Sequence, residues 1–282
     1  MRHWALQNEA QAKRLEAFFK RRGIACNVPG FCDHDAFLRL EQENPRLLEP
    51  YAHYIETKIY TPEYLTIAHQ KITIVAGVLR AAIEQDGRLG ACVDASGILS
   101  RMLDRAGVFN YIAQTCLTIS YPPDTFLENT YFYAIDSHPM TAPHEVVVAP
   151  PFYVVDITAK YQPYGANQAD FLPEMLLLDR FTRANWTPED IVAPEFQIAI
   201  IRGGVSLNQF LARNYSNVMD VMQMLPARQM THSPLGTVLK YIPVAVGGVI
   251  EPLEQMTGYQ PCGRMPHVIF NEDVLPLLTE IS

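Results

Sequence analysis

The sequence lacks the features that mark membrane-spanning, disulfide-rich and nucleic-acid-binding proteins. It has no run of 18 apolar residues, and its first 22 residues contain no apolar signal core. Its five cysteines are few, odd in number and not spaced in pairs, which argues against a disulfide framework. Acidic residues outnumber basic ones, 30 against 22, which argues against a strongly electropositive surface. We therefore expect a cytoplasmic protein with no membrane span and no nucleic-acid partner.

The composition that remains is that of a globular protein. Hydrophobic residues make up 49% of the 282 residues and charged residues 18%. This length predicts one large domain or two smaller ones, with enough chain for a sizeable core. Residues 1–22 carry six basic side chains and two acidic ones, with apolar positions at helical spacing. We expect this segment to be a helix that packs on the core with its basic face in solvent; contact with anionic lipid or a partner is the alternative.

Periodicity and turn signals divide the chain into a helical part at 1–60, an α+β core at 61–164 and a mostly helical part at 165–282. Capping residues and glycines delimit the predicted helices. The expected helices are 7–22, 35–43, 62–86, 92–106, one starting near 188, 207–225 and a short one after Ser233-Pro234. The expected strands are 111–120, 130–135, 145–148 and 153–157.

Cys92 lies where a glycine-flanked loop, residues 87–91, runs into a predicted helix. A cysteine at a helix start lies in the positive field of the helix dipole, near unpaired backbone N–H groups. Both favour the thiolate, the form that attacks a carbonyl carbon, and the same N–H groups can stabilise an oxyanion. The position therefore suits a nucleophile, although a small buried cysteine at a helix end would give the same pattern.

His144 and Asp156 lie at the outer ends of two short apolar strands that are separated by the turn at 149–151. Such a pair predicts an antiparallel hairpin, which would bring the two side chains near each other. An aspartate that accepts a hydrogen bond from one imidazole nitrogen fixes the tautomer and leaves the other nitrogen for a thiol. Taken singly, a solvated histidine at a strand edge and a solvated aspartate at a turn remain the alternatives.

Two segments resemble the transglutaminase-like superfamily, whose members have a papain-like Cys-His-Asp fold. Residues 90–108 resemble its nucleophile helix, in which a cysteine begins an amphipathic helix that closes on a glycine and a β-branched residue. Residues 144–158 resemble its second signature, in which a histidine opens one strand and an aspartate followed by a threonine closes the next. The order Cys, His, Asp also agrees, as do the gaps of 52 and 12 residues. Val146 and Pro151-Phe152 depart from the residues common in that family.

The resemblance implies an α+β fold in which the nucleophile helix packs on an antiparallel sheet flanked by helical segments. It implies that Cys92 is the nucleophile, His144 the general base and acid, and Asp156 the residue that orients the histidine. The expected activity is thiol-dependent acyl transfer or hydrolysis at an amide of a protein or peptide substrate, through a thioester and without cofactor or metal. A peptidase, a deamidase and a transglutaminase share that first half-reaction. The alternative is a non-catalytic protein-interaction module that retains the fold.

Two weaker candidates remain. Gln85 precedes Cys92 by seven residues, close to where papain-like enzymes carry a glutamine, but we expect it to cap the preceding helix. Cys26, Cys32 and His34 lie within nine residues of one another. Zinc sites usually contain two close ligand pairs, and no second pair is present, so we expect a polar loop there.

Overall fold

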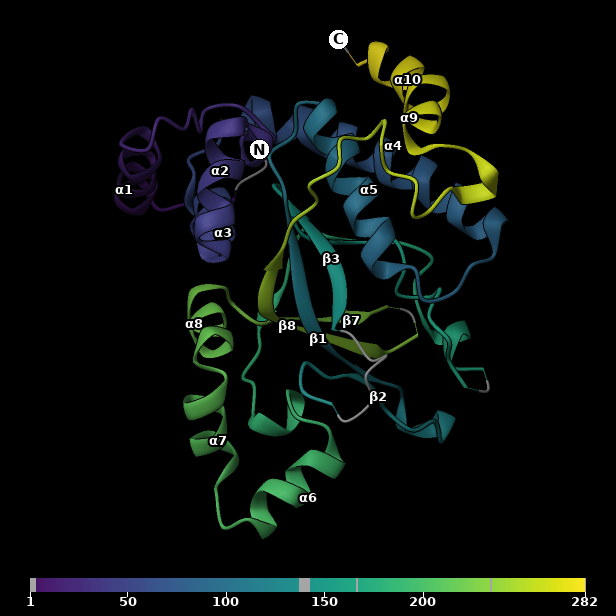
Figure 1. Ribbon diagram of the computed structural model, residues 1–282. Helices are drawn as coiled ribbons and strands as arrows, with labels where there is room; N and C mark the ends of the chain where they lie inside the picture. The colour runs from purple at the N-terminus through teal and green to yellow at the C-terminus, as the bar shows by residue number, and fades with distance from the viewer. Residues whose placement is uncertain (1–3, 137–142, 166, 234, 282) are drawn as a thin grey trace.

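One antiparallel sheet organises the computed structural model, which describes residues 4–136, 143–165, 167–233 and 235–281 (Figure 1). Among these residues the strands follow the order β5-β4-β3-β1-β8-β7-β6, and β2 pairs with β1 beside β3. The strands are β1 (Tyr111–Ser120), β2 (Thr130–Phe132), β3 (His144–Ala149), β4 (Phe152–Asp156), β5 (Leu176–Leu178), β6 (Thr182–Arg183), β7 (Arg228–His232) and β8 (Thr237–Gly247). The central position of β1 and β8 makes the C-terminal part of the chain integral to the sheet.

Helices cover the sheet in three groups, at upper left, upper right and bottom of Figure 1. The first group is α1 (Glu9–Lys20), α2 (Asp35–Glu43) and α3 (Leu48–Thr57). The second is α4 (Pro62–Asp86), α5 (Cys92–Arg105), α9 (Pro266–Ile269) and α10 (Leu275–Thr279). The third is α6 (Pro194–Arg202), α7 (Leu207–Asn214) and α8 (Ser216–Met224). No described helix is long and apolar enough to cross a membrane.

Side chains along β1 and β3 alternate between the core under the first helical group and the core under the second. Tyr111 and Val146 pack in the core formed with α1–α3, whereas Ile112 and Val147 pack in the core formed with α4 and α5. Successive residues of a strand point to opposite faces, so one strand supplies both cores. The sheet is therefore buried on both faces where the helices cover it.

Local sequence signals account for the position of α5. Thr61 caps α4 through a hydrogen bond from the Tyr64 N–H group, and Gly87 ends α4 with a φ of 74°. Gly90 has a φ of 73°, in the left-handed region that favours glycine, and its N–H group donates to the Tyr161 carbonyl at 2.9 Å. These two glycines let the chain turn sharply from α4 into α5, which begins at Cys92.

Many of the predicted elements are confirmed, including the α+β class, the helix at 35–43 and the long helix that ends at Gly87. Within the basic N-terminal segment, Glu9–Lys20 form α1, a helix that packs on the core through Ala12, Leu15 and Phe19, whereas residues 1–3 of that segment lie outside the described residues. The segment starting at Pro188 is a short 3-10 turn rather than a longer helix. The helix predicted over 207–225 is two helices, α7 and α8, which are separated at Tyr215.

The short helix predicted after Ser233 is wrong. Residues 237–247 form β8, which pairs with β1 along its length and with β7, and the Gly236 N–H group donates to the His232 carbonyl where these two strands meet. Pro243 lies beyond the last residue of β8 that pairs with β7, where its missing N–H group breaks no bond to that strand. Long-range pairing with β1 therefore overrides the local helix-start signal.

We expect the stability of the fold to fall as the pH rises because of Asp104, a carboxyl group on α5 whose side chain is only 11% exposed. Burial raises the pKa of Asp104 to about 7, against the opposing effects of Arg101 and a 2.8 Å hydrogen bond from Asn110. The unfolded chain then holds fewer protons than the folded protein between pH 5 and pH 7, so the free energy of unfolding should decrease by about 2 kcal/mol over that range. Asp104→Asn, which keeps an acceptor for Asn110, should flatten the dependence. Urea denaturation at several pH values measures it, and an equally steep slope in the variant would contradict the prediction.

Candidate active site

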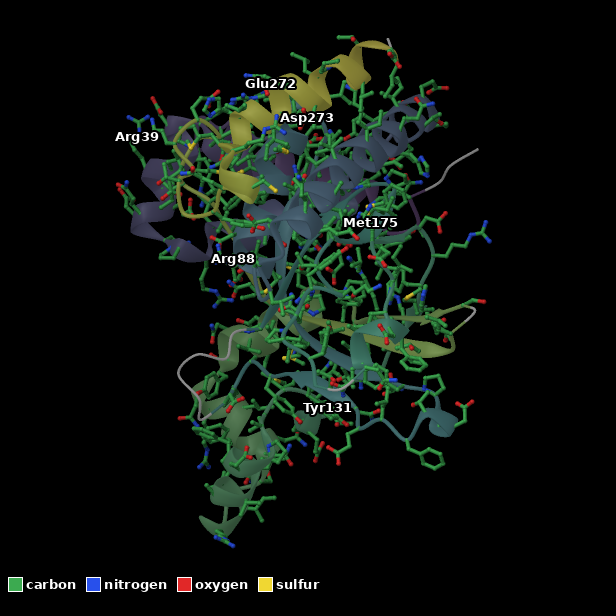
Figure 2. All side chains as sticks on the ribbon, turned by 90° about the vertical axis from the view of Figure 1, so that its right-hand side faces the viewer. Arg39, Arg88, Tyr131, Met175, Glu272 and Asp273 are labelled. Atoms are coloured by element: carbon green, nitrogen blue, oxygen red, sulfur yellow. The ribbon has the colours of Figure 1, made fainter. Side chains whose placement is uncertain are left out.

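Cys92 is the first residue of α5, at the end of the loop that contains Arg88, labelled in Figure 2. The N-cap residue Ala91 makes no side-chain capping bond, so the N–H groups of the first helical turn lack that usual partner. The helix packs on β3, where the Ser96 hydroxyl donates to the Glu145 carbonyl at 3.0 Å. Cys92 is 8% exposed. The thiol therefore lies in the positive field of α5, close to the start of β3.

His144 and Asp156 are brought together by the β3–β4 hairpin. His144 is the first residue of β3 and Asp156 the last of β4, as the sequence predicts, and the two strands are antiparallel. The His144 Nε2 atom lies 2.7 Å from Asp156 Oδ2, and the two side chains have no solvent exposure. The hairpin predicted from the turn at 149–151 thus positions a buried histidine–carboxylate pair.

Asp156 acts only as an acceptor of hydrogen bonds. Its Oδ2 atom accepts from the Tyr241 hydroxyl at 2.9 Å in addition to His144, and its Oδ1 atom accepts from the Thr158 N–H group at 2.9 Å and from the Thr158 hydroxyl at 3.3 Å. Four such bonds suit a charged carboxylate and leave no need for a proton on it. The proton between the pair therefore belongs to His144 Nε2.

With Nε2 bound to Asp156, the Nδ1 atom of His144 is the nitrogen left for Cys92. It is buried and makes no hydrogen bond to the described residues. Burial favours a lower pKa for His144, but the charge of Asp156 and its hydrogen bond, helped by Cys92, raise the pKa well above its ordinary range. Burial favours a higher pKa for Cys92, but His144 and a backbone hydrogen bond from Glu145 lower it. These opposite shifts favour a thiolate–imidazolium pair at neutral pH.

Aromatic rings enclose the imidazole. The Phe132 ring of β2 lies with its centroid 5.4 Å from that of His144, and the Tyr241 ring lies at 6.4 Å. Tyr131, the neighbour of Phe132 that is labelled in Figure 2, has 42% of its surface exposed. Water is largely excluded from the His144–Asp156 pair, which strengthens the interaction of their charges.

The weaker candidates from the sequence do not join this site. Gln85 is exposed in the last turn of α4, where Gly87 and not Gln85 ends the helix. Across the described ranges, no three His, Cys, Asp or Glu side chains are close enough to hold a metal ion, the segment from Cys26 to His34 included. The thiol of Cys32 instead donates to Asp33 Oδ1 at 3.4 Å.

Tyr241 is the site residue that the sequence did not reveal. It lies on β8, 85 residues after Asp156, in a region expected to be mostly helical. No motif surrounds it, and its contact with Asp156 exists only because β8 pairs with β1 in the middle of the sheet. Recognising 237–247 as a strand would have been the first sequence signal that Tyr241 lies in the sheet near Asp156.

No family model, characterised protein or solved structure matches this chain. The arrangement of its own residues is therefore the basis for assigning a function.

Proposed function

We propose that the protein catalyses thiol-dependent acyl transfer or hydrolysis at an amide, with Cys92 as nucleophile, His144 as acid and base, and Asp156 as the residue that orients His144. The observation that carries this proposal is the set of four hydrogen bonds accepted by Asp156. They hold the imidazole with Nε2 bound and Nδ1 left for a thiol at a helix start. This is the division of roles that a nucleophile, a base and an orienting group require.

The first half-reaction uses the charges of the resting pair. The Cys92 thiolate attacks the carbonyl carbon, and the π electrons move to the carbonyl oxygen, where the N–H groups of the first turn of α5 can stabilise the oxyanion. The oxyanion collapses, the C–N bond breaks, and the amine or ammonia leaves with the Nδ1 proton of His144. A thioester on Cys92 and a neutral imidazole remain.

The second half-reaction restores the pair. Water or an amine attacks the thioester while His144 Nδ1 takes its proton, and the C–S bond breaks to return the thiolate. Water as acceptor makes the protein a peptidase or deamidase, and an amine makes it a transglutaminase. A protein or peptide amide is the substrate class that this chemistry and the resemblance of 90–108 and 144–158 to the transglutaminase-like superfamily support.

Alkylation of each cysteine by iodoacetamide, measured against pH and located by peptide mass spectrometry, tests the proposal. Cys92 should react first, well below pH 8, because its pKa is lowered. Burial raises the pKa of Cys26 and, to about 12, the pKa values of Cys32 and Cys116, so these should stay unmodified in the native protein. Cys262 is exposed and serves as the reference thiol.

Turnover provides the second test, with amide peptides supplied with and without a primary amine. Cys92→Ala should abolish release of the amine or ammonia while leaving the fold intact, since one small buried group replaces another. Unchanged turnover in this variant would end the proposal. So would alkylation of native Cys92 only in parallel with Cys262 or only after denaturation, and the non-catalytic interaction module would then be favoured.

A further inference from the structure

Tyr241 joins the catalytic pair to the centre of the sheet. It lies on β8, where its backbone faces Leu117 of β1 on one side and Arg228 of β7 on the other. The side chain is 1% exposed, and its hydroxyl donates to Asp156 Oδ2 at 2.9 Å. That oxygen is the one that accepts from His144. A residue held between two paired strands thus contacts the atom that holds the imidazole.

We propose that Tyr241 is a positioning residue for the reaction, which acts through Asp156 and sets the range of pH over which Cys92 is a reactive thiolate. This inference rests on the proposed function, because it assigns Tyr241 a part in activating the same thiol. Tyr241 does not touch the reacting atoms. It holds the carboxylate in one rotamer and in its charged form, and Asp156 in turn holds His144 as an imidazolium.

The geometry supports a role that Thr158 cannot supply alone. Both Thr158 bonds reach Oδ1, and the residue follows Asp156 by only two positions, so it moves with the strand end that it binds. Tyr241 reaches Oδ2 from the opposite part of the sheet, across 85 residues of sequence. Bonds at both oxygens, from two separate elements, restrict rotation of the carboxylate about its side-chain bonds.

Electrostatics leads to the same role. A carboxylate without solvent exposure is stable only where donors and a positive charge replace water. The Tyr241 hydroxyl is one of the donors that lower the pKa of Asp156, against burial, together with His144 and Thr158. Loss of that donor makes Asp156 easier to protonate, and a neutral Asp156 no longer stabilises the imidazolium on which the Cys92 thiolate depends.

Tyr241→Phe tests the proposal because it removes only the hydroxyl. We expect the alkylation rate of Cys92 at pH 6 to fall about ten-fold, with the acid-side midpoint of the rate profile moving up by about one pH unit. The two profiles should converge at higher pH. Tyr111→Phe is the matched control: Tyr111 is equally buried, and its hydroxyl also donates to a buried carboxylate, Glu56 Oε1, at 2.6 Å. It should lower thermal stability to a similar extent and leave the profile unchanged.

A double variant decides whether Tyr241 acts through Asp156. In an Asp156→Asn background, Tyr241→Phe should cause no further change in the Cys92 profile, because the group it positions is gone. Additive losses would overturn the proposal, as would a Tyr241→Phe profile that matches wild type or a profile shifted equally by Tyr111→Phe. A wild-type Cys92 with no reactivity below pH 8 would overturn the proposed function and this inference together, whereas a reactive Cys92 indifferent to Tyr241 would overturn the inference alone.

Discussion

Replacing His144 by glutamine is expected to reduce the alkylation rate of Cys92 at pH 6 by about 100-fold. In the native protein the imidazolium lowers the pKa of the thiol, while burial and the charge of Asp156 raise it. Without the imidazolium, only the backbone bond from Glu145 and the field of α5 oppose those two effects, and the thiol should remain protonated until well above pH 8. Glutamine is preferred to alanine because its amide can still donate to Asp156.

The pH profile adds a second expectation for His144. The pKa of His144 is raised to about 10. The dependence of Cys92 reactivity on the ion pair should therefore persist through neutral pH and end only where the imidazolium loses its proton in alkali. His34→Ala, at the exposed N-cap of α2, is the control histidine and should leave the Cys92 profile unchanged. Cys262 in the same sample reports any change in reagent or exposure. A His144→Gln variant whose Cys92 keeps its wild-type profile would show that His144 does not activate the thiol.

The parts of this fold that local signals control could be predicted from sequence. Thr61, Pro62 and Gly87 define α4 because a cap, a proline at the first helical turn and a left-handed glycine each act within a few residues. The hairpin with His144 and Asp156 at its outer ends depends on a turn of two residues, Pro150 and Pro151, between two apolar strands. The hairpin alone was sufficient to place a histidine beside an aspartate.

The remaining parts depend on contacts that are distant in sequence. Strand β8 is set by pairing with β1, more than a hundred residues earlier, and the local signal at Ser233 pointed to a helix instead. For the same reason Tyr241 could not be associated with Asp156 before β8 was placed. The proximity of Cys92 to His144 required the packing of α5 on β3, which the sequence indicated only through the family resemblance.

A buried ion pair between Glu56 and Arg228 is a further long-range feature that the sequence did not indicate. Arg228 of β7 is 1% exposed and Glu56 of α3 is 3% exposed, and the Arg228 Nη2 group donates to Glu56 Oε1. The Nη1 group donates to the Tyr153 carbonyl, and the Tyr111 hydroxyl also donates to Glu56 Oε1. The pair joins the N-terminal helices to the strand beside Tyr241, across 172 residues of sequence.

Arg228→Met is therefore expected to lower the free energy of unfolding by about 3–5 kcal/mol, because it leaves the Glu56 carboxylate buried without its counter-charge. Methionine fills much of the arginine volume, which limits the contribution of a cavity. Urea denaturation monitored by far-UV circular dichroism measures the change as a lower midpoint at constant slope. The exposed pair Lys13–Glu9 on α1 supplies the control, since Lys13→Met should leave the midpoint unchanged.

The double variant Arg228→Met/Glu56→Gln separates lost charge compensation from lost packing. If the cost of Arg228→Met comes from an uncompensated carboxylate, removing that charge should restore much of the stability, because a neutral amide in the same place still accepts from Tyr111. If the double variant is as unstable as the single one, the lost free energy of unfolding comes from packing around the guanidinium group. That group lies 5.8 Å from the ring centroids of both Tyr153 and Phe181, which supply the packing contacts. Equal stability of Arg228→Met and wild type would contradict both explanations.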